Sequence, residues 1–224
     1  MADYLASIYG TEKDNVYLQF YIYVFITIFS KTLQFCCFPR VNCSFYFKIG
    51  ACRHGDRCSR KHIKPTYSQT VLISNVYQNP SHDPSCLLSK EEIQQHFDLF
   101  FEDMFLELAK YGEIIELKIC DNVGDHLVGN VYVQFRYEED ALNCVEKLND
   151  RYYAGRPLWA ELSPVTDFRE ACCRQYEVGE CNRSGFCNFM HLKYPSRGIE
   201  SDLYRGQKLT LKELQKNRSE SGRD

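Results

Sequence analysis

The sequence predicts an α+β fold in which a β-α-β-β-α-β sandwich is flanked by two small modules rich in cysteine and histidine. Two observations predict it: a regular succession of strand and helix patterns in the middle of the chain, and a Cys-Cys-Cys-His pattern that occurs twice. The 224 residues suffice for one domain and two small modules. A hydrophobic fraction of 44% and a charged fraction of 25% argue against a mostly disordered chain.

The repeated pattern has the spacing of a metal site. Its residues are Cys43, Cys52, Cys58 and His62, and then Cys173, Cys181, Cys187 and His191. Three thiolates and one imidazole complete the tetrahedral shell of zinc, so no position stays open for water and the role is structural. We therefore predict two CCCH zinc fingers, at residues 41–65 and 166–196, which hold two zinc ions. Cys172 gives the second finger an alternative spacing that matches the first, and spacing alone leaves this choice open.

The N-terminal region, although it contains an apolar segment, does not indicate a secreted or a membrane protein. Asp3, Glu12 and Asp14 stand where a signal peptide carries positive charge, so we expect a reducing compartment. An N-terminal segment at residues 1–15 is followed by an apolar insert at residues 16–40. The uninterrupted apolar run covers residues 16–29, which is shorter than the about 20 residues of a membrane span. We therefore expect no membrane partner.

The middle domain, at residues 66–165, shows the periodicities of alternating strands and helices. Apolar or alternating segments predict strands at residues 71–77, 113–120, 128–135 and 157–162. Ser89 and Glu92 form a capping box ahead of a helix, and residues 138–148 form a second helix. The apolar residues of the first helix recur at helical spacing: Ile93, Phe97, Phe100, Phe101, Met104, Phe105 and Leu108. This order is that of an RNA recognition motif (RRM), so we predict an RRM-like sandwich between the fingers.

The segment VGNVYVQF, at residues 128–135, stands where a recognition motif has its main RNA-stacking strand. That strand normally begins with a basic residue, a glycine and an aromatic residue. Here Val128 stands at the basic position and Asn130 at the first aromatic position. Tyr132 and Phe135 are the aromatic residues of the pattern that remain. The domain has seven basic and seventeen acidic side chains, a net charge of −10. Because carboxylates repel phosphates, we expect this domain to bind a basic protein segment better than RNA.

The fingers, in contrast, carry side chains that bind single-stranded RNA, namely aromatic rings that stack on bases and arginines that reach phosphates. The first finger, with a net charge of +5, offers Phe45, Tyr46, Phe47, Arg53, Arg57 and Arg60. The second, which is neutral overall, offers Arg174, Tyr176, Arg183, Phe186 and Phe189. For each aromatic ring, packing around the zinc ion is the alternative role.

Three segments together are similar to a known family: FYFKIGACRHGDRCSRKH, DNVGDHLVGNVYVQF and ELSPVTDFREACCRQYEVGECNRSGFCNFMHLK. With the order finger, degenerate recognition motif, finger, the chain closely resembles the small subunit of the U2 snRNP auxiliary factor over residues 1–15 and 41 to about 196. The resemblance implies a non-enzymatic pre-mRNA splicing factor of the nucleus, whose fingers read the AG of the 3′ splice site. It also implies a heterodimer, in which the middle domain grips a tryptophan-bearing peptide of the large subunit. It favours Cys173 over Cys172 as the zinc ligand.

The resemblance assigns further site residues. Ser59 and Gln175 fall at finger positions that the family associates with the nucleotides flanking the AG. The family's Arg-x-Phe signature corresponds to Arg151, Tyr152 and Tyr153, where two tyrosines replace a tryptophan and a phenylalanine. The Tyr153 hydroxyl would cost about 1–3 kcal/mol if it were buried without a partner.

The acidic face of the first helix, with Glu102 and Asp103, is the expected contact for the basic peptide. At residues 16–40 an insert interrupts a segment that is continuous in the family, and we interpret it as retained intron sequence or an alternative exon outside the family fold. The family's long Arg/Ser tail is replaced at residues 197–224 by a mixed-charge, helix-like piece with Leu209, Leu211 and Leu214.

Two alternative functions stay open. One is an interaction-only product that binds the large subunit and reads RNA poorly, because the insert adjoins the first finger. The other is a CCCH protein of messenger-RNA turnover, which the acidic middle domain disfavours. Metalloenzyme chemistry is disfavoured because neither predicted zinc shell has an open position.

Overall fold

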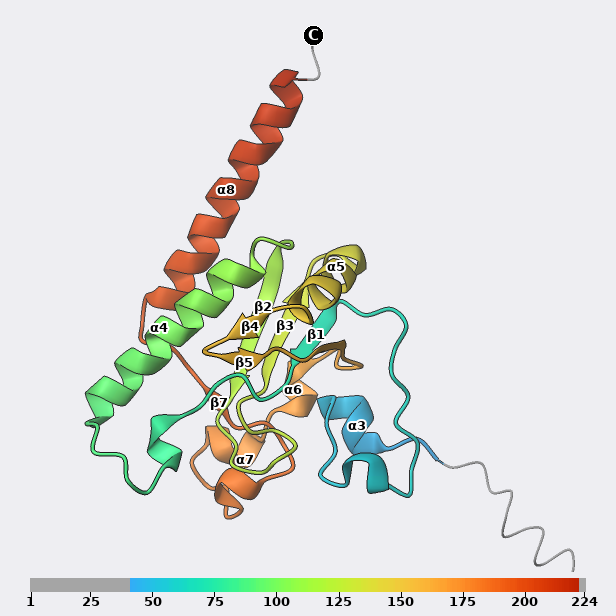
Figure 1. Cartoon of the computed structure of the whole chain (residues 1–224), viewed down its shortest axis with the longest axis vertical. Helices are drawn as coiled ribbons and strands as arrows, with labels where there is room; N and C mark the ends of the chain where they lie inside the picture. The colour runs from blue at the N-terminus through green and yellow to red at the C-terminus, as the bar shows by residue number, and fades with distance from the viewer. Residues whose placement is uncertain (1–40, 222–224) are drawn as a thin grey trace, which may run out of the picture. The chain divides into compact units, whose positions relative to one another are not determined.

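The computed structural model describes residues 41–221, so the segment at 1–15 and the insert at 16–40 lie outside the described residues. A five-stranded antiparallel sheet forms the centre, in the order β6-β1-β3-β2-β7 (Figure 1). Its strands are β1 (Thr70–Ile73), β2 (Ile114–Cys120), β3 (Val131–Phe135), β6 (Ala160–Leu162) and β7 (Leu192–Lys193). The first four of these strands and two helices follow the predicted β-α-β-β-α-β order.

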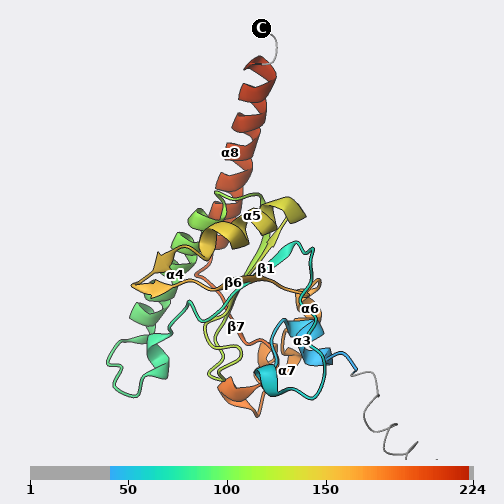
Figure 2. The same cartoon turned by 45° about the vertical axis from the view of Figure 1, so that its right-hand side comes forward.

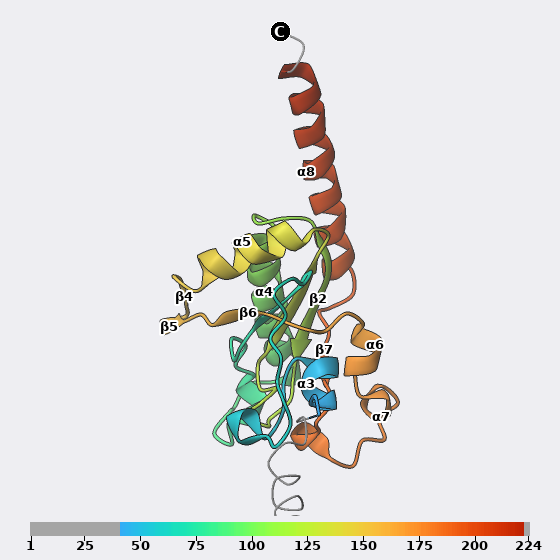
Figure 3. The same ribbon diagram turned by 90° about the vertical axis from the view of Figure 1, so that its right-hand side faces the viewer.

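The helices α4 (Lys90–Leu108) and α5 (Glu138–Leu148) cover one face of the sheet (Figures 1 and 3). The predicted capping box is present: the Ser89 hydroxyl accepts a hydrogen bond from the Glu92 N–H, and the Glu92 carboxylate accepts one from the Ser89 N–H. The main core lies between these helices and the sheet. It contains six of the seven predicted apolar side chains of α4: Phe97, Phe100, Phe101, Met104, Phe105 and Leu108.

The two fingers cover the opposite face of the sheet. The first finger contributes α3 (Ser44–Ile49) and the turn η1 (Gly55–Arg57), and the second contributes α6 (Phe168–Ala171), α7 (Arg174–Glu177) and η3 (Ser184–Phe186). Figure 2 shows α3, α6 and α7 gathered together beside the sheet. A second core lies beneath them, with the buried residues Ile49, Leu72, Cys120, Leu127, Tyr132, Val165, Phe168, Ala171, Met190 and Leu192.

The alternation along β3 shows which side chains face the fingers, because neighbouring strand residues point to opposite faces. Val131, Val133 and Phe135 lie in the core beneath the helices, whereas Tyr132 lies beneath the fingers. Phe135, one of the two aromatic residues that survive of the recognition pattern, therefore faces the helices and not the side on which a recognition motif stacks bases. Tyr132 is on the face where a recognition motif stacks bases, but it is fully buried, and its hydroxyl donates a hydrogen bond of 2.8 Å to the carbonyl of Ile49.

Gly50 allows the first finger to approach the sheet closely. It ends α3 with a φ of 74°, which L residues rarely adopt. A Cβ atom at this position would collide with the Ser163 hydroxyl and press on the Tyr132 ring. Glycine is thus required by both the turn and the packing.

The second finger is held by the chain that leaves β2. The side-chain nitrogen of Asn122 donates to the carbonyls of Cys187 (3.3 Å) and Phe189 (3.0 Å), and its oxygen accepts from the backbone N–H of His191 (2.8 Å). Directly after His191, β7 pairs with β2 and extends the sheet. The position of the second zinc cluster is therefore fixed to the sheet by a strand and a buried amide.

The end of the middle domain differs from the predicted single strand at 157–162. A small hairpin of β4 (Tyr152–Tyr153) and β5 (Arg156–Pro157) comes first, and β6 begins only at Ala160. Between β1 and α4 the chain forms the short turn η2 (Pro80–His82), which the Asn79 side chain caps.

The predicted helical piece of the tail is part of a longer helix, α8 (Ile199–Ser221). Its first turns pack on α4 and β2: the rings of Tyr204 and Phe105 meet edge to face, and the Gln207 amide hydrogen-bonds to the backbone N–H and C=O of Ile114. No helix within residues 41–221 is long and apolar enough to cross a membrane. The apolar run at 16–29 lies outside the described residues.

We predict that Tyr132→Phe lowers the free energy of unfolding by about 1–3 kcal/mol, because the buried Ile49 carbonyl loses its partner. Urea unfolding monitored by circular dichroism measures this difference. Tyr137→Phe is the matched control, since Tyr137 is exposed and should leave stability nearly unchanged. Equal stability of the Tyr132 variant and the parent chain would show that the hydroxyl does not hold the finger on the sheet.

Candidate metal centres and nucleic-acid interface

The structure brings both predicted ligand sets together. In each finger the four ligand atoms lie within 4.8 Å of one another, in clusters formed by Cys43, Cys52, Cys58 and His62 and by Cys173, Cys181, Cys187 and His191. The measured sulfur–sulfur distances are 3.7 to 3.9 Å. Tetrahedral zinc with bonds of about 2.3 Å to sulfur requires about 3.8 Å between thiolates. The spacing of the sulfurs therefore fits zinc.

The histidines give an independent test of the fit. The Nε2 atoms of His62 and His191 are buried and have no hydrogen-bond partner among the described residues, as expected of nitrogens reserved for a metal. Each imidazole is stacked on a tyrosine ring: the ring centroids of Tyr46 and His62 are 4.5 Å apart, and those of Tyr176 and His191 are 4.0 Å apart. Zinc bound in these clusters would be structural, because each set supplies all four ligands.

The structure places Cys173 in the second cluster and Cys172 outside it. Cys172 pairs through its backbone with Met190, and burial raises the pKa of its thiol to about 11. Cys120 and Cys144 lie in the two cores, where burial keeps their thiols neutral by raising their pKa.

Five of the seven candidate RNA residues lie around the contact between the two fingers. The rings of Phe45 and Phe189 are in edge-to-face contact at 6.0 Å, and Lys48 forms an ion pair of 3.0 Å with Glu170. A cavity of about 380 Å³ adjoins this contact on the side of the second finger, and its lining includes Arg174, Gln175, Arg183 and Phe189. A cavity of about 300 Å³ lies on the other side, lined by Phe45, Ala51, Cys52, Arg53, His54, His126 and Asn188.

The other predicted finger residues differ in their accessibility. Ser59 and Arg60 are exposed, with the Arg60 guanidinium at 3.5 Å from the Ser44 hydroxyl. Phe47 and Phe186 are also exposed. For Tyr46, the prediction of a base-stacking ring is wrong: it is only 7% exposed, and its face is occupied by His62. Tyr176 is partly exposed, yet one of its faces covers His191.

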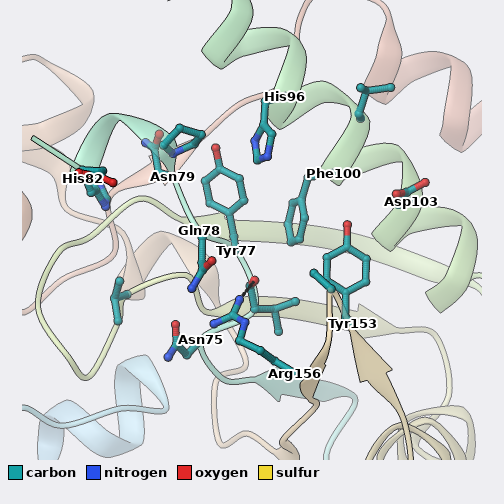
Figure 4. Close-up of a pocket in the computed structure, with 16 residues that line it drawn as sticks. Asn75, Tyr77, Gln78, Asn79, His82, His96, Phe100, Asp103, Tyr153 and Arg156 are labelled. Atoms are coloured by element: carbon teal, nitrogen blue, oxygen red, sulfur yellow. Dashed lines mark hydrogen bonds between the residues drawn. The ribbon is translucent and has the colours of Figure 1, made fainter. Parts of the chain in front are cut away.

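The candidate partner residues lie on the helical side of the sheet. Figure 4 shows a cavity of about 720 Å³, in which the rings of Tyr77, Phe100 and Tyr153 follow one another with centroid separations of 4.8 and 5.6 Å. Asp103 lines the same cavity. Burial, and then the negative charge of Asp103, raises the pKa of Tyr153.

The remaining partner residues do not line this cavity. Arg151 forms an ion pair with Glu107 and donates to the Tyr111 hydroxyl at 3.1 Å. Burial alone would raise the pKa of Glu107, but hydrogen bonds from Lys110 and Tyr111 lower it. Glu102 is exposed on α4, and Tyr152 projects from the β4–β5 hairpin with an exposed fraction of 71%.

Sequence reasoning missed two residues that shape this site: Asn122 fixes the second finger to the sheet, and His126 lines a cavity beside the first finger. It named Tyr132 but did not foresee that this residue holds the first finger on the sheet. Asn122 and His126 lie in a polar stretch between two strands, which indicates a loop. Such a stretch does not reveal which element the loop contacts.

Comparisons with known proteins agree with this geometry. The CCCH zinc-finger family (C-x8-C-x5-C-x3-H type) matches residues 38–64 and 167–193, and the RNA recognition motif family matches residues 101–159. The fold and the ligand clusters thus define a protein with an RNA recognition motif between two CCCH zinc fingers.

Curated relatives specify the family further. The splicing factor U2AF 23 kDa subunit of Schizosaccharomyces pombe is 55% identical over 212 residues, which cover 94% of this chain and 87% of the relative. The Drosophila melanogaster U2af 38 kDa subunit is 59% identical, covering 91% and 71%, and the Rattus norvegicus U2AF 26 kDa subunit is 56% identical, covering 91% and 84%. This chain belongs to the U2AF small-subunit family, whose members are splicing factors and not enzymes.

We predict that the purified chain holds two zinc ions, and that Cys173→Ala retains one while Cys172→Ala retains two. The reason is geometric: Cys173 belongs to the ligand cluster, and Cys172 does not. Metal content measured by mass spectrometry on protein dialysed against trace zinc gives the answer. Loss of an ion from the Cys172 variant would show that Cys172 is a zinc ligand and contradict this assignment.

Proposed function

We propose that this chain is the small subunit of a splicing heterodimer that recognises the AG of the 3′ splice site with its two fingers. One observation carries the proposal: the sheet face with which a recognition motif usually binds RNA is buried under the fingers. RNA must therefore bind on the outer sides of the fingers, and the opposite helical face is left for a protein.

The fingers supply a suitable RNA surface. Two cavities adjoin the Phe45–Phe189 contact; Arg53 is among the residues that line one, and Arg174 among those that line the other. Rings and guanidinium groups at one junction suit single-stranded RNA, whose unstacked bases need flat partners and whose phosphates need cations. Ser59 follows ligand Cys58 directly and is exposed, so bound zinc would hold its backbone rigidly at the surface of the first finger.

The helical face suits a basic, tryptophan-bearing segment of the large subunit. Asp103 and Glu102 present carboxylates on α4, and the cavity in Figure 4 offers an aromatic lining beside Asp103. Charges of opposite sign across an interface guide association and fix its register. We propose that the peptide binds along α4 with an aromatic side chain near Tyr153.

The splicing-factor relatives imply a nuclear location, which we also propose for this chain. The interaction-only alternative makes a different prediction, because such a product would bind the peptide without discriminating AG from other dinucleotides. Binding of the chain to RNAs that end in AG or in a mutated dinucleotide, with and without the peptide, separates the two functions.

We predict that Ser59→Phe changes base preference more than overall affinity. A bulky ring beside the zinc ligand would fill the space that a base edge occupies, and would favour some bases next to the AG over others. Fluorescence anisotropy with four RNAs that differ only in the base before the AG measures this effect. Equal losses on all four RNAs would show that Ser59 has no part in specificity.

Arg60→Ala provides the comparison for this experiment. Loss of an exposed cation should weaken the binding of all four RNAs alike. It should also reduce the slope of the logarithm of affinity against the logarithm of salt concentration by about one. A change in base preference would contradict a phosphate-binding role for Arg60.

We predict that the double substitution Glu102→Lys/Asp103→Lys weakens the binding of a basic, tryptophan-containing peptide by about tenfold or more at low salt, because electrostatic attraction becomes repulsion. The difference should shrink as salt rises. Glu180→Lys is the control, since it places a lysine at an exposed position of the second finger, away from α4. Unchanged affinity in the double variant, measured by calorimetry, would assign the peptide to another surface.

A further inference from the structure

The chain contains one tryptophan, Trp159, and this residue lies open to solvent with an exposed fraction of 68%. Tryptophan has the largest apolar side chain and is highly buried on average in folded proteins. Where it stays on a surface, it is enriched at sites that a partner covers. The exposed indole of Trp159 therefore indicates a binding surface, and its place in the fold limits what binds there.

Trp159 directly precedes the edge strand β6, and strand pairing shows which face of the sheet it occupies. Its carbonyl accepts a hydrogen bond of 2.9 Å from the backbone N–H of Ser74, which continues the pairing of β6 with β1. Ala160 belongs to the core beneath the helices, and successive strand residues point to opposite faces. Trp159 therefore shares its face with Glu161, whose partner on β1 is Leu72 of the core beneath the fingers.

The fingers leave this part of the sheet face uncovered. A cavity of about 540 Å³ lies between the first finger and the sheet, with Ser74 and Glu161 among its lining on the sheet side and Arg53 on the finger side. Arg53 also lines the cavity beside Phe45, so the two cavities adjoin. Open space thus leads from the junction of the fingers to the two residues that flank Trp159 in the sheet.

The edge of β6 is closed to an added protein strand. The backbone N–H of Ala160 donates to the side-chain oxygen of Asn149 at 2.8 Å, and its carbonyl accepts from the Asn149 side-chain nitrogen at 3.0 Å. A strand that extends the sheet would need both of these backbone groups. The indole face is therefore available to a flat side group, and not to an extended segment that pairs with β6.

The charges beside the indole are balanced. Glu161 forms an ion pair of 2.6 Å with Lys64 of the first finger. Because neighbours on one face of a strand lie about 6.5 Å apart, this pair stands close to Trp159. A balanced surface attracts a basic peptide less than the carboxylates of α4 do. Stacking of a base on an aromatic ring, in contrast, depends on the flat face that all bases share.

We propose that Trp159 stacks one unpaired base of an RNA that is bound at the fingers. The inference rests on the proposed function, since it extends the RNA surface of the fingers onto the sheet. Recognition motifs stack bases on aromatic rings of this sheet face, but Tyr132 is buried beneath the first finger. Trp159 takes over this role at the uncovered edge. Because stacking tolerates any base, the contact adds affinity and not AG specificity.

The single tryptophan makes this contact directly observable. Indole fluorescence of the full zinc-loaded chain is recorded during titration with RNAs that contain AG and carry uridine extensions of increasing length on the 5′ or the 3′ side. A stacked base quenches indole emission, so we expect quenching to begin once the extension on one side is long enough to reach Trp159. Acrylamide should quench the emission of the free chain, and the extended RNA should protect the indole from acrylamide.

Variants measure what the stack contributes to affinity. In anisotropy with labelled RNA, Trp159→Ala should weaken the binding of the extended RNA by about 5- to 150-fold and leave the shortest RNA and the AG preference unchanged. Trp159→Phe keeps a ring and should retain most of the affinity. Tyr137→Ala is the matched control, because it removes an exposed ring beside α5, on the helical side of the sheet, and should bind every RNA like the parent chain.

Parent-like affinity of Trp159→Ala for the extended RNA would overturn the stacking site, and so would unchanged emission while that RNA is bound. An indole that is shielded from acrylamide in the free chain would also overturn it, as would quenching by a basic peptide with phenylalanine in place of tryptophan but not by RNA. A parent chain without AG discrimination would overturn the proposed function instead, while quenching that depends on extension length would still support the stack. A parent chain that binds no RNA would overturn both.

Discussion

The contact between the two fingers and one face of the sheet is the interaction on which the rest of the structure depends. The first finger buries little by itself, since its own cluster consists of Cys43, Tyr46 and Cys52. Modules of this size cannot form a core without a metal or a partner surface. The sheet supplies that surface through Leu72 and Tyr132, and apolar residues of both fingers complete a second core. Zinc would set the shape of each finger, and the sheet sets its position.

This contact also divides the molecule into surfaces with different electrostatic properties. The covered face can no longer stack bases, and the proposed function places RNA on the basic first finger instead, close to the junction with the second finger. The acidic helices lie across the sheet, where their carboxylates repel phosphates least and can attract a basic protein segment. The ion pair between Arg151 and Glu107 neutralises part of this face and connects α4 to the residue that precedes the β4–β5 hairpin.

The sequence was sufficient to predict features that depend on local spacing. Ligand intervals identified both zinc clusters, and the Ser89–Glu92 capping box located the start of α4. Features that depend on contacts between distant segments were missed. Alternation in β3 could have separated Tyr132 from Phe135, yet no local pattern shows that a finger would cover Tyr132. The three hydrogen bonds of Asn122 likewise join segments more than sixty residues apart.

The hydrogen bond from Tyr132 to Ile49 spans 83 residues, and the order of synthesis gives this distance a consequence. The ribosome makes the first finger before the sheet on which it rests. From the last zinc ligand of the finger, His62, to Tyr132 the ribosome adds 70 residues, so at about 5–20 residues per second the finger waits about 4–14 seconds. During that interval only its metal and its own small cluster can hold it in shape. Prompt zinc loading on the nascent chain would therefore protect its cysteines from oxidation and its apolar side chains from aggregation.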